Sequence, residues 1–243
     1  GASSVKGLRD YNGVASAICQ LTNNSNGRST TTYGVGFGSY IIVNRHLFKE
    51  NNGNLLIKST HGNFNIRNSK QIKVVGVEDR DIAILQMPKD FPPFAQRLRF
   101  RNPIVGESIC LVGNTFQEKY NASIVSETSK TFPRVEGSFW KHWINTTEGH
   151  CGLPLVSVTD GFIVGIHSLM SHKYDHNYFS NFDDAFEGDY INKLKELKWE
   201  QNWTYNVNTV SWGNMKLQDS APCKEFKTTK LISDLCTEPV CAQ

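Results

Sequence analysis

One cysteine of this chain lies on a turn that is suited to covalent chemistry. Cys151 is part of the segment Glu148-Gly149-His150-Cys151-Gly152, which directly precedes the apolar run Leu153-Pro154-Leu155-Val156. Glycine on both sides lets the backbone turn tightly, so consecutive N–H groups near the cysteine can point at one oxyanion. Acyl transfer by a thiolate requires such a setting, but most cysteines are inert buried thiols. The segment alone therefore leaves catalysis and simple burial as roughly equal alternatives.

A histidine and an aspartate could complete a catalytic site around this cysteine. His46 follows the apolar run Tyr40-Ile41-Ile42-Val43, and Asp81 precedes the apolar run Ile82-Ala83-Ile84-Leu85. An imidazole can take and return the thiol proton, and a carboxylate can orient the imidazole. Taken singly, each residue could instead be an ordinary strand-end or turn residue. The chain order of histidine, aspartate and nucleophile is that of chymotrypsin-like enzymes, and it favours catalysis.

Short strands are predicted to position these residues. Apolar or alternating runs recur along the chain and are bounded by turn signals such as Asn51-Asn52-Gly53, His61-Gly62-Asn63 and Asp160-Gly161. The first group of predicted strands covers residues 33–38, 40–43, 55–58, 63–66, 82–85 and 109–112. The second group covers residues 123–125, 155–158, 162–167 and 209–212.

This pattern predicts an all-β chain of two antiparallel β-units in tandem, with closed or sandwiched sheets. The first unit would span residues 1–117 and carry His46 and Asp81, and the second would span residues 118–220 and carry Cys151. One short helix is expected at residues 184–199, where apolar side chains recur at spacings of three and four. The polar tail, residues 221–243, is weakly patterned and is predicted to be mobile.

Composition narrows the functional classes. The net charge of +3 does not by itself call for a nucleic-acid partner, although basic runs beside Phe100 and Trp199 leave local patches open. The six cysteines show no CxxC pair and no Cys/His spacing suited to zinc, so we expect no metal and no cofactor. A reduced, intracellular chain is the simpler interpretation. We identify no signal peptide and no membrane span.

Beyond these residues, the sequence resembles the potyvirus-type nuclear inclusion protein a proteases, which are plant-virus enzymes with a cysteine nucleophile. Their chymotrypsin-like fold implies that the two units are antiparallel β-barrels. The resemblance covers nearly the whole chain. Its motifs are Gly7-Leu8-Arg9-Asp10-Tyr11-Asn12, Gly36-Phe37-Gly38, His46-Leu47-Phe48, Gly62-Asn63-Phe64, Arg80-Asp81-Ile82, Pro88-Lys89-Asp90-Phe91-Pro92-Pro93-Phe94, Phe139-Trp140-Lys141-His142-Trp143-Ile144 and Gly149-His150-Cys151-Gly152.

The resemblance implies a cysteine endopeptidase that processes a viral polyprotein by cutting after glutamine and before a small residue. By this resemblance His46 is the general base and acid, Asp81 orients it and Cys151 is the nucleophile. The backbone N–H groups of Gly149 and Cys151 would form the oxyanion hole. An aspartate is common in relatives at the position of Glu148, so we expect Glu148 to lie near the pocket but leave its contribution open.

The resemblance also implies the residues that bind the substrate. His167 and Thr146 match the family's glutamine pocket, and a neutral imidazole and a hydroxyl can both donate to an amide oxygen. Without the resemblance they would be taken as a core histidine and a turn hydroxyl. The substrate would pair in extended form as an added strand. The outer positions implied for its groove are Phe139, Leu169, Met170, Asn177, Tyr178 and Trp212.

Further partners follow from the same resemblance. It implies RNA binding without sequence preference, contact with other viral replication proteins, and residence in the host cytoplasm and nucleus. The chain begins with Gly1 and ends in Glu238-Pro239-Val240-Cys241-Ala242-Gln243, which is similar to the family's recognition sequences, so we expect the tail to be a product that can revisit the groove. The alternative is a catalytically inactive chymotrypsin-fold module that binds RNA or protein, which the intact histidine, aspartate and cysteine disfavour.

Overall fold

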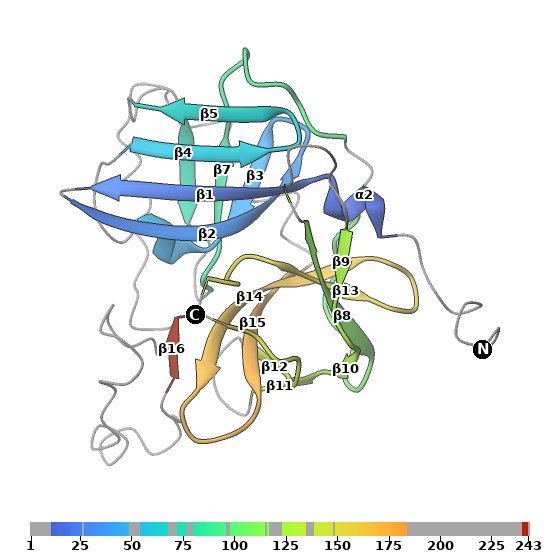
Figure 1. Ribbon diagram of the computed structural model, residues 1–243. Helices are drawn as coiled ribbons and strands as arrows, with labels where there is room; N and C mark the ends of the chain where they lie inside the picture. The colour runs from blue at the N-terminus through green and yellow to red at the C-terminus, as the bar shows by residue number, and fades with distance from the viewer. Residues whose placement is uncertain are drawn as a thin grey trace.

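Two antiparallel β-sheets make up most of the described part of the chain (Figure 1). The computed structural model describes residues 11–25, 27–48, 54–67, 72–76, 80–95, 98–114, 116, 123–134, 139–147, 149–183 and 240–242. The predicted all-β fold with two antiparallel units is confirmed.

The first sheet has seven strands in the order β5-β4-β1-β2-β3-β7-β6. Its strands alternate between the core and solvent, as in β4, where Leu55 and Ile57 are buried and Leu56 and Lys58 are exposed. The strands are β1 (Ile18–Ser25), β2 (Arg28–Phe37), β3 (Tyr40–Val43), β4 (Asn54–Ser59), β5 (Gly62–Ile66), β6 (Lys73–Gly76) and β7 (Ala83–Gln86).

The second sheet has nine strands, with β10-β8-β13-β14-β15-β12-β11 as its main order. β13 and β14 are buried almost along their whole length, which explains their continuous apolar sequences. The strands are β8 (Ser108–Asn114), β9 (Ser123–Val125), β10 (Ser129–Lys130), β11 (Phe132–Pro133), β12 (Phe139–His142), β13 (Pro154–Ser157), β14 (Ile163–Ser171), β15 (Asn177–Asn181) and β16 (Val240–Ala242).

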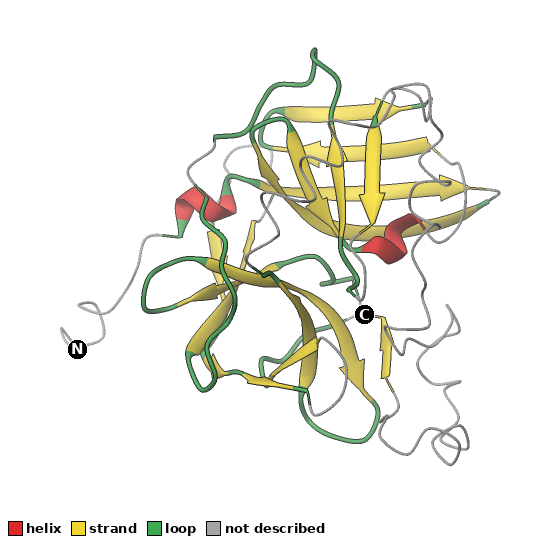
Figure 2. Cartoon of the chain, turned by 180° about the vertical axis from the view of Figure 1, so that it is seen from behind, coloured by secondary structure: helices red, strands yellow, loops and turns green. Residues whose placement is uncertain are grey.

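Within the described residues, two short helical segments accompany the sheets (Figure 2). The α-helix α2 (Asn12–Ala15) packs against β8, and the side-chain amide of Asn114 donates to the carbonyl of Ala15 at 2.9 Å. The 3₁₀ turn η1 (Arg45–Phe48) directly follows β3 and buries Leu47 and Phe48. Because η1 begins where β3 ends, His46 is held at the end of a buried strand.

The two sheets share one hydrophobic core. Val35, Ile42 and Ile84 of the first sheet belong to the same buried cluster as Leu155 and Val164 of the second. A second cluster, which includes Leu21, Val43 and Leu85, lies within the first sheet. The functional site described below lies where the two sheets meet, so packing of this shared core also fixes the site.

Several sequence predictions differ from the structure or fall outside the described residues. β8 lies before the predicted domain boundary at residue 117, but it pairs with β13 and so belongs to the second sheet. The chain therefore passes from the first sheet to the second between residues 86 and 108. The sequence pattern shows where strands occur but not which partner they choose. The predicted helix at 184–199 and the predicted strand at 209–212 lie outside the described residues. Within the tail that was predicted to be mobile, residues 240–242 form β16 against β14.

Candidate active site

His46 and Asp81 meet at one end of the first sheet. Val43 of β3 pairs with Ala83 of β7, so the residues after β3 and before β7 lie side by side. Nδ1 of His46 lies 2.6 Å from Oδ2 of Asp81, and the backbone N–H of His46 donates to Oδ1 of Asp81 at 3.0 Å. Asp81 is fully buried. The carboxylate therefore fixes both the backbone and the ring of the histidine.

Asn44 adds a third donor to the carboxylate of Asp81, and sequence reasoning missed it. Its Nδ2 atom lies 3.2 Å from Oδ2 of Asp81 and also 3.0 Å from the carbonyl oxygen of His167 and 3.3 Å from Oγ of Ser168. One amide thus connects the carboxylate in the first sheet to β14 in the second. An asparagine before a turn gives no such signal in the sequence, because its usual role is to stabilise the turn itself.

Cys151 lies on the turn before β13 and faces the histidine. Its side chain hydrogen-bonds the ring of His46, and its Sγ atom lies 3.3 Å from the carbonyl oxygen of Ser168. Gly149 and Gly152 both have positive φ, at 94° and 90°, as the flanking glycines predicted. The structure therefore brings the three predicted catalytic residues together.

The turn at Cys151 is also packed closely against the first sheet. A Cβ atom on Gly152 would lie 1.9 Å from the carbonyl oxygen of Tyr33, so no side chain fits there. The N–H of Gly152 donates to the carbonyl of His167 at 2.9 Å, and the N–H of His150 donates to the carbonyl of Thr147 at 3.2 Å. These two donors face the protein. The N–H groups of Gly149 and Cys151, which the resemblance implies for an oxyanion hole, belong to the residues on either side of His150 in the same turn.

Thr146 and His167 are each held by a hydrogen-bonded side chain of the second sheet. Nδ2 of Asn177 donates to Oγ1 of Thr146 at 3.0 Å and to the carbonyl of Ile144 at 2.9 Å. Asn177 of β15 is paired with His142 of β12. Nε2 of His142 lies 3.0 Å from Nδ1 of the fully buried His167. Sequence reasoning found His142 only as part of a motif and gave it no function.

Comparison with known proteins identifies the family to which this site belongs. The family model of peptidase family C4 matches residues 2–233. The chain belongs to peptidase family C4. It is thus a cysteine endopeptidase with the chymotrypsin-like fold, as the resemblance predicted.

Relatives of this C4 peptidase are known both in sequence and in structure. The chain is 49% identical over 241 residues to the genome polyprotein of Bean common mosaic necrosis virus (strain NL-3), covering 99% of the chain but 8% of the polyprotein. It is also 49% identical over 238 residues to that of Ornithogalum mosaic virus, covering 98% of the chain and 21% of the polyprotein. The C151A mutant of tobacco etch virus protease matches with a TM-score of 0.79 at 44% identity, covering 97% of this chain and 98% of that one. Tobacco vein mottling virus protease matches with a TM-score of 0.78 at 44% identity, covering 87% and 97%.

Electrostatics of the C4 peptidase site favour a charged imidazole. Burial alone favours the neutral ring of His46, but the negative charges of Asp81 and Cys151 and the hydrogen bonds to both residues outweigh burial. Together they raise the pKa of His46 above its ordinary value of 6.5. The surroundings of His46 therefore favour its charged form more than those of an ordinary histidine do.

The end of β14 that extends beyond β13 pairs with a segment of the tail. This segment, β16, pairs antiparallel, with Leu169 opposite Ala242, Met170 opposite Cys241 and Ser171 opposite Val240, and Figure 1 shows β16 beside β14. Of the predicted groove residues, Phe139, Leu169 and Tyr178 are buried, whereas Met170 and Asn177 are partly exposed. The predicted residues Glu148 and Trp212 lie outside the described part of the chain.

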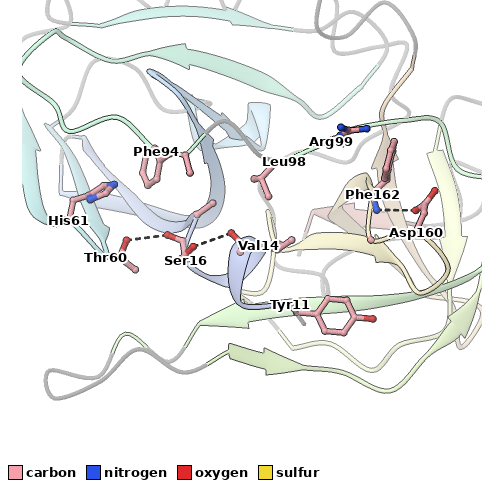
Figure 3. A pocket seen from close by; sticks show the side chains of 14 residues that line it. Tyr11, Val14, Ser16, Thr60, His61, Phe94, Leu98, Arg99, Asp160 and Phe162 are labelled. Carbon is pink, nitrogen blue, oxygen red and sulfur yellow. Dashed lines mark hydrogen bonds between the residues drawn. The ribbon is translucent and has the colours of Figure 1, made fainter. Parts of the chain in front are cut away.

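Two of the cavities among the described residues lie apart from this edge. One of about 160 Å³ is lined by Tyr33, His150 and Leu153, among others, beside the turn of the nucleophile. Another of about 560 Å³ is formed by α2, the β4–β5 turn, the segment around Phe94 and the turn at Asp160, and Figure 3 shows its lining. None of the three predicted catalytic residues lines the larger cavity, so it is not the catalytic centre.

The described residues hold no group of three or more histidine, cysteine, aspartate and glutamate side chains arranged to bind a metal ion. Among the helices in the described ranges, none is both long enough and apolar enough to cross a membrane.

Proposed function

We propose that this C4 peptidase cleaves polypeptides after glutamine and before a small residue, and that its natural substrate is a viral polyprotein. Cys151 would be the nucleophile, His46 the general base and acid, and Asp81 the residue that orients His46. The observation that carries the proposal is the single hydrogen-bonded series from Asp81 through His46 to Cys151. The polyprotein substrate is supported by relatives in which the matching segment is part of a genome polyprotein.

Acylation would begin with attack of the Cys151 sulfur on the carbonyl carbon of the substrate's glutamine. An S–C bond forms, and the carbonyl oxygen becomes an oxyanion that accepts hydrogen bonds from the N–H groups of Gly149 and Cys151. The C–N bond then breaks, and the proton held by His46 passes to the leaving amine. The product of this half-reaction is a thioester on Cys151 and a free amino terminus.

Deacylation would use water and the same histidine. Neutral His46 takes a proton from the water that attacks the thioester carbonyl, and a second oxyanion forms in the same place. The S–C bond breaks, and the peptide leaves as a carboxylic acid that loses its proton to water and becomes the new carboxylate. The Cys151–His46 pair again holds one proton. Asp81 stays ionised throughout and keeps the ring of His46 in position.

Thr146 and His167 support glutamine as the residue before the cut. Thr146 is held by Asn177 and His167 by His142, so neither side chain rotates freely. A hydroxyl and a neutral imidazole can donate to a side-chain amide oxygen, whereas a glutamate carboxylate would be buried without a compensating positive charge. The backbone of the substrate would pair with β14 as β16 does.

Matched peptides that differ only at the residue before the cut test this proposal. We expect kcat/KM to be at least about 100-fold higher for glutamine than for glutamate or asparagine, since the pocket must desolvate the side chain it binds. Thr146→Val keeps the shape of the side chain and removes its hydroxyl, and it should lower kcat/KM for the glutamine peptide. Equal cleavage of the glutamine and glutamate peptides would exclude a glutamine pocket.

A second candidate function is RNA binding, which the structure favours at one surface of the second sheet. Phe132, Trp143 and Tyr174 are large side chains exposed to 40%, 42% and 50%. They form a continuous row with His176, because Phe132 lies 6.0 Å from Trp143, Trp143 5.7 Å from His176, and His176 5.2 Å from Tyr174, measured between ring centroids. We call these four residues the aromatic surface. Exposed rings of this kind can stack on unpaired bases.

Basic side chains border the aromatic surface. Lys141 is paired with Phe132 across β11 and β12, and Nζ of Lys173 lies 5.2 Å from the ring centroid of Tyr174. Lysines beside stacking rings bind the phosphates of single-stranded nucleic acid without reading its sequence. The host compartment and contacts with other viral replication proteins stay predictions from the resemblance.

Fluorescence anisotropy with a short single-stranded RNA would test this second function. We expect affinity to fall steeply between 50 and 200 mM salt and Trp143→Ala to weaken binding by about 1–3 kcal/mol. Ile104→Ala alters an exposed apolar residue outside the aromatic surface and should leave affinity unchanged. Affinity that does not depend on salt or on Trp143 would refute RNA binding at this surface.

A further inference from the structure

Two buried histidines contact each other beneath the proposed glutamine pocket. Nε2 of His142 lies 3.0 Å from Nδ1 of His167, and both side chains are fully buried. The two rings are nearly perpendicular, with centroids 5.1 Å apart. The other ring nitrogen of His142, Nδ1, accepts a hydrogen bond from the backbone N–H of Ile144 at 3.2 Å. Both nitrogens of His142 therefore have a defined partner.

These contacts determine where the hydrogens lie. Because Nδ1 of His142 accepts from a backbone N–H, it carries no hydrogen, and the neutral ring must carry its hydrogen on Nε2. Nε2–H then donates to Nδ1 of His167, which therefore carries no hydrogen either. The opposite assignment would leave His142 without any hydrogen, as an anion, which an imidazole does not form near neutral pH. A neutral His167 consequently carries its hydrogen on Nε2.

The surroundings keep this pair neutral. The pKa of His142 is held well below its usual value. The main cause is burial of the ring, and the positive charges that His167 and His176 would carry lower it further. Nε2 of His176 lies 2.8 Å from the hydroxyl of Tyr178, and the guanidinium of Arg134 lies 5.0 Å from the centroid of the Tyr178 ring. An imidazolium at His142 would therefore be a buried charge close to two further histidines.

We propose that His142 is a positioning residue that fixes the hydrogen of His167 on Nε2 and so makes His167 an obligatory donor toward the side-chain carbonyl of the substrate's glutamine. The inference rests on the proposed glutamine specificity and explains how the pocket achieves it. A histidine with the other tautomer would present a bare Nε2, which accepts hydrogen bonds and repels a carbonyl oxygen. A charged histidine would attract glutamate instead.

Thr146, the second proposed donor, is held by a residue that pairs with His142. Asn177 is the pairing partner of both His142 on β12 and Met170 on β14, and its side chain holds Thr146. His142 and Asn177 therefore hold one proposed donor each from neighbouring positions in the sheet. A pocket whose two donors are fixed in advance loses less entropy when it binds an amide oxygen.

The tautomer can be observed directly without any substrate. Long-range ¹H–¹⁵N spectra of ¹⁵N-histidine-labelled Cys151→Ala protein show which ring nitrogen carries hydrogen, and single histidine substitutions assign the signals. We expect both His142 and His167 to carry hydrogen on Nε2 at pH 7. In His142→Phe protein we expect both neutral tautomers of His167 to be populated, with hydrogen on Nδ1 in some molecules and on Nε2 in others. A wild-type His167 with its hydrogen on Nδ1 would overturn the proposal.

The cleavage kinetics of two variants then show whether His142 positions His167 or only fills space in the core. His142→Phe fills the space of the imidazole but offers no hydrogen-bond donor. It should lower kcat/KM for the glutamine peptide roughly 10-fold, mainly by raising KM. It should also reduce the preference for glutamine over glutamate. His142→Gln offers an amide N–H to His167 and a carbonyl to Ile144, and it should recover most of the loss. His61→Phe, at the distant cavity, serves as the matched control.

The outcomes distinguish this inference from the proposed function. Folded His142→Phe protein with an unchanged KM and an unchanged glutamine preference would overturn the positioning role. A wild-type protein that shows the expected tautomers but no preference for glutamine would instead refute the proposed specificity, and with it the purpose assigned to His142. If His142→Phe does not fold, the wild-type spectrum and the His142→Gln kinetics still decide the question.

Discussion

The backbone N–H of Tyr33 donates to the carbonyl of Cys151 at 2.7 Å, so β2 of the first sheet holds the turn that carries the nucleophile of the second. The next residue, Gly152, lies directly against the carbonyl of Tyr33. Asn44 connects the same two parts of the molecule from the other side, through the carboxylate of Asp81 and the carbonyl of His167. The geometry of the catalytic residues therefore depends on how the two sheets dock.

Gly152→Ala should separate the sheets at this point. The new Cβ would lie 1.9 Å from the carbonyl oxygen of Tyr33, and the backbone at Gly152 has φ of 90°. We expect the free energy of unfolding to fall by about 2–4 kcal/mol, from strain and overpacking together, with loss of peptidase activity. Thermal or urea unfolding and a peptide assay measure the two effects.

Gly62→Ala is the matched control for that substitution. Gly62 also has positive φ, at 120°, but a Cβ there would meet no atom within 4 Å. It should cost about 1–3 kcal/mol from backbone strain alone and leave kcat/KM close to wild type. Equal effects of the two substitutions on activity would contradict the role assigned to the contact between Tyr33 and Gly152.

Asp81→Asn should change the pH dependence of cleavage as well as its rate. The raised pKa of His46 means that its proton, which the leaving amine needs, is present below that pKa and lost as pH rises through it. The alkaline limb of kcat/KM should therefore lie well above pH 6.5 in the wild type and move to lower pH in Asp81→Asn. We also expect a rate loss of roughly 10²–10⁴-fold, less than that of Cys151→Ala. An alkaline limb that does not move would show that Asp81 does not control the proton of His46.

Removing residues 240–243 should make the edge of β14 more available to substrate. β16 occupies that edge opposite Leu169, Met170 and Ser171, where we propose that substrate pairs. A tethered segment competes with added peptide at a high effective concentration, so we expect KM to fall by about threefold or more with little change in kcat. A synthetic peptide of residues 238–243 should inhibit the truncated protein. A truncated chain with unchanged KM would argue against competition by the tail.

The sequence predicted the residues of the site better than the contacts among them. The glycines beside Cys151 and the apolar runs beside His46 and Asp81 are local signals, and the structure places all three residues together. Asn44 and His142 gave no comparable signal, because their partners His167 and Asp81 lie far away in the chain and are reached only through tertiary packing. Local patterns carry little information about such contacts.

The strand predictions likewise succeeded where the signal is local and failed where tertiary pairing decides. The strands rich in branched or aromatic residues, such as β3 and β14, were predicted because their composition alone indicates them. β1 was missed since its second half, Thr22-Asn23-Asn24-Ser25, resembles a turn, yet it pairs with both β2 and β4. β15, with the sequence Asn177-Tyr178-Phe179-Ser180-Asn181, was missed for the same reason. In both cases pairing on two sides outweighs the preference of asparagine for turns.

The central claim is that the sulfur of Cys151 carries the acyl group of a peptide ending in glutamine. Intact-protein mass spectrometry after rapid acid quench of a glutamine thioester or activated-ester peptide measures this directly. We predict a mass increase equal to the acyl peptide, mapped to Cys151 by digestion and absent from Cys151→Ala protein. Acylation at another residue, or continued peptide cleavage by Cys151→Ala protein, would contradict the account.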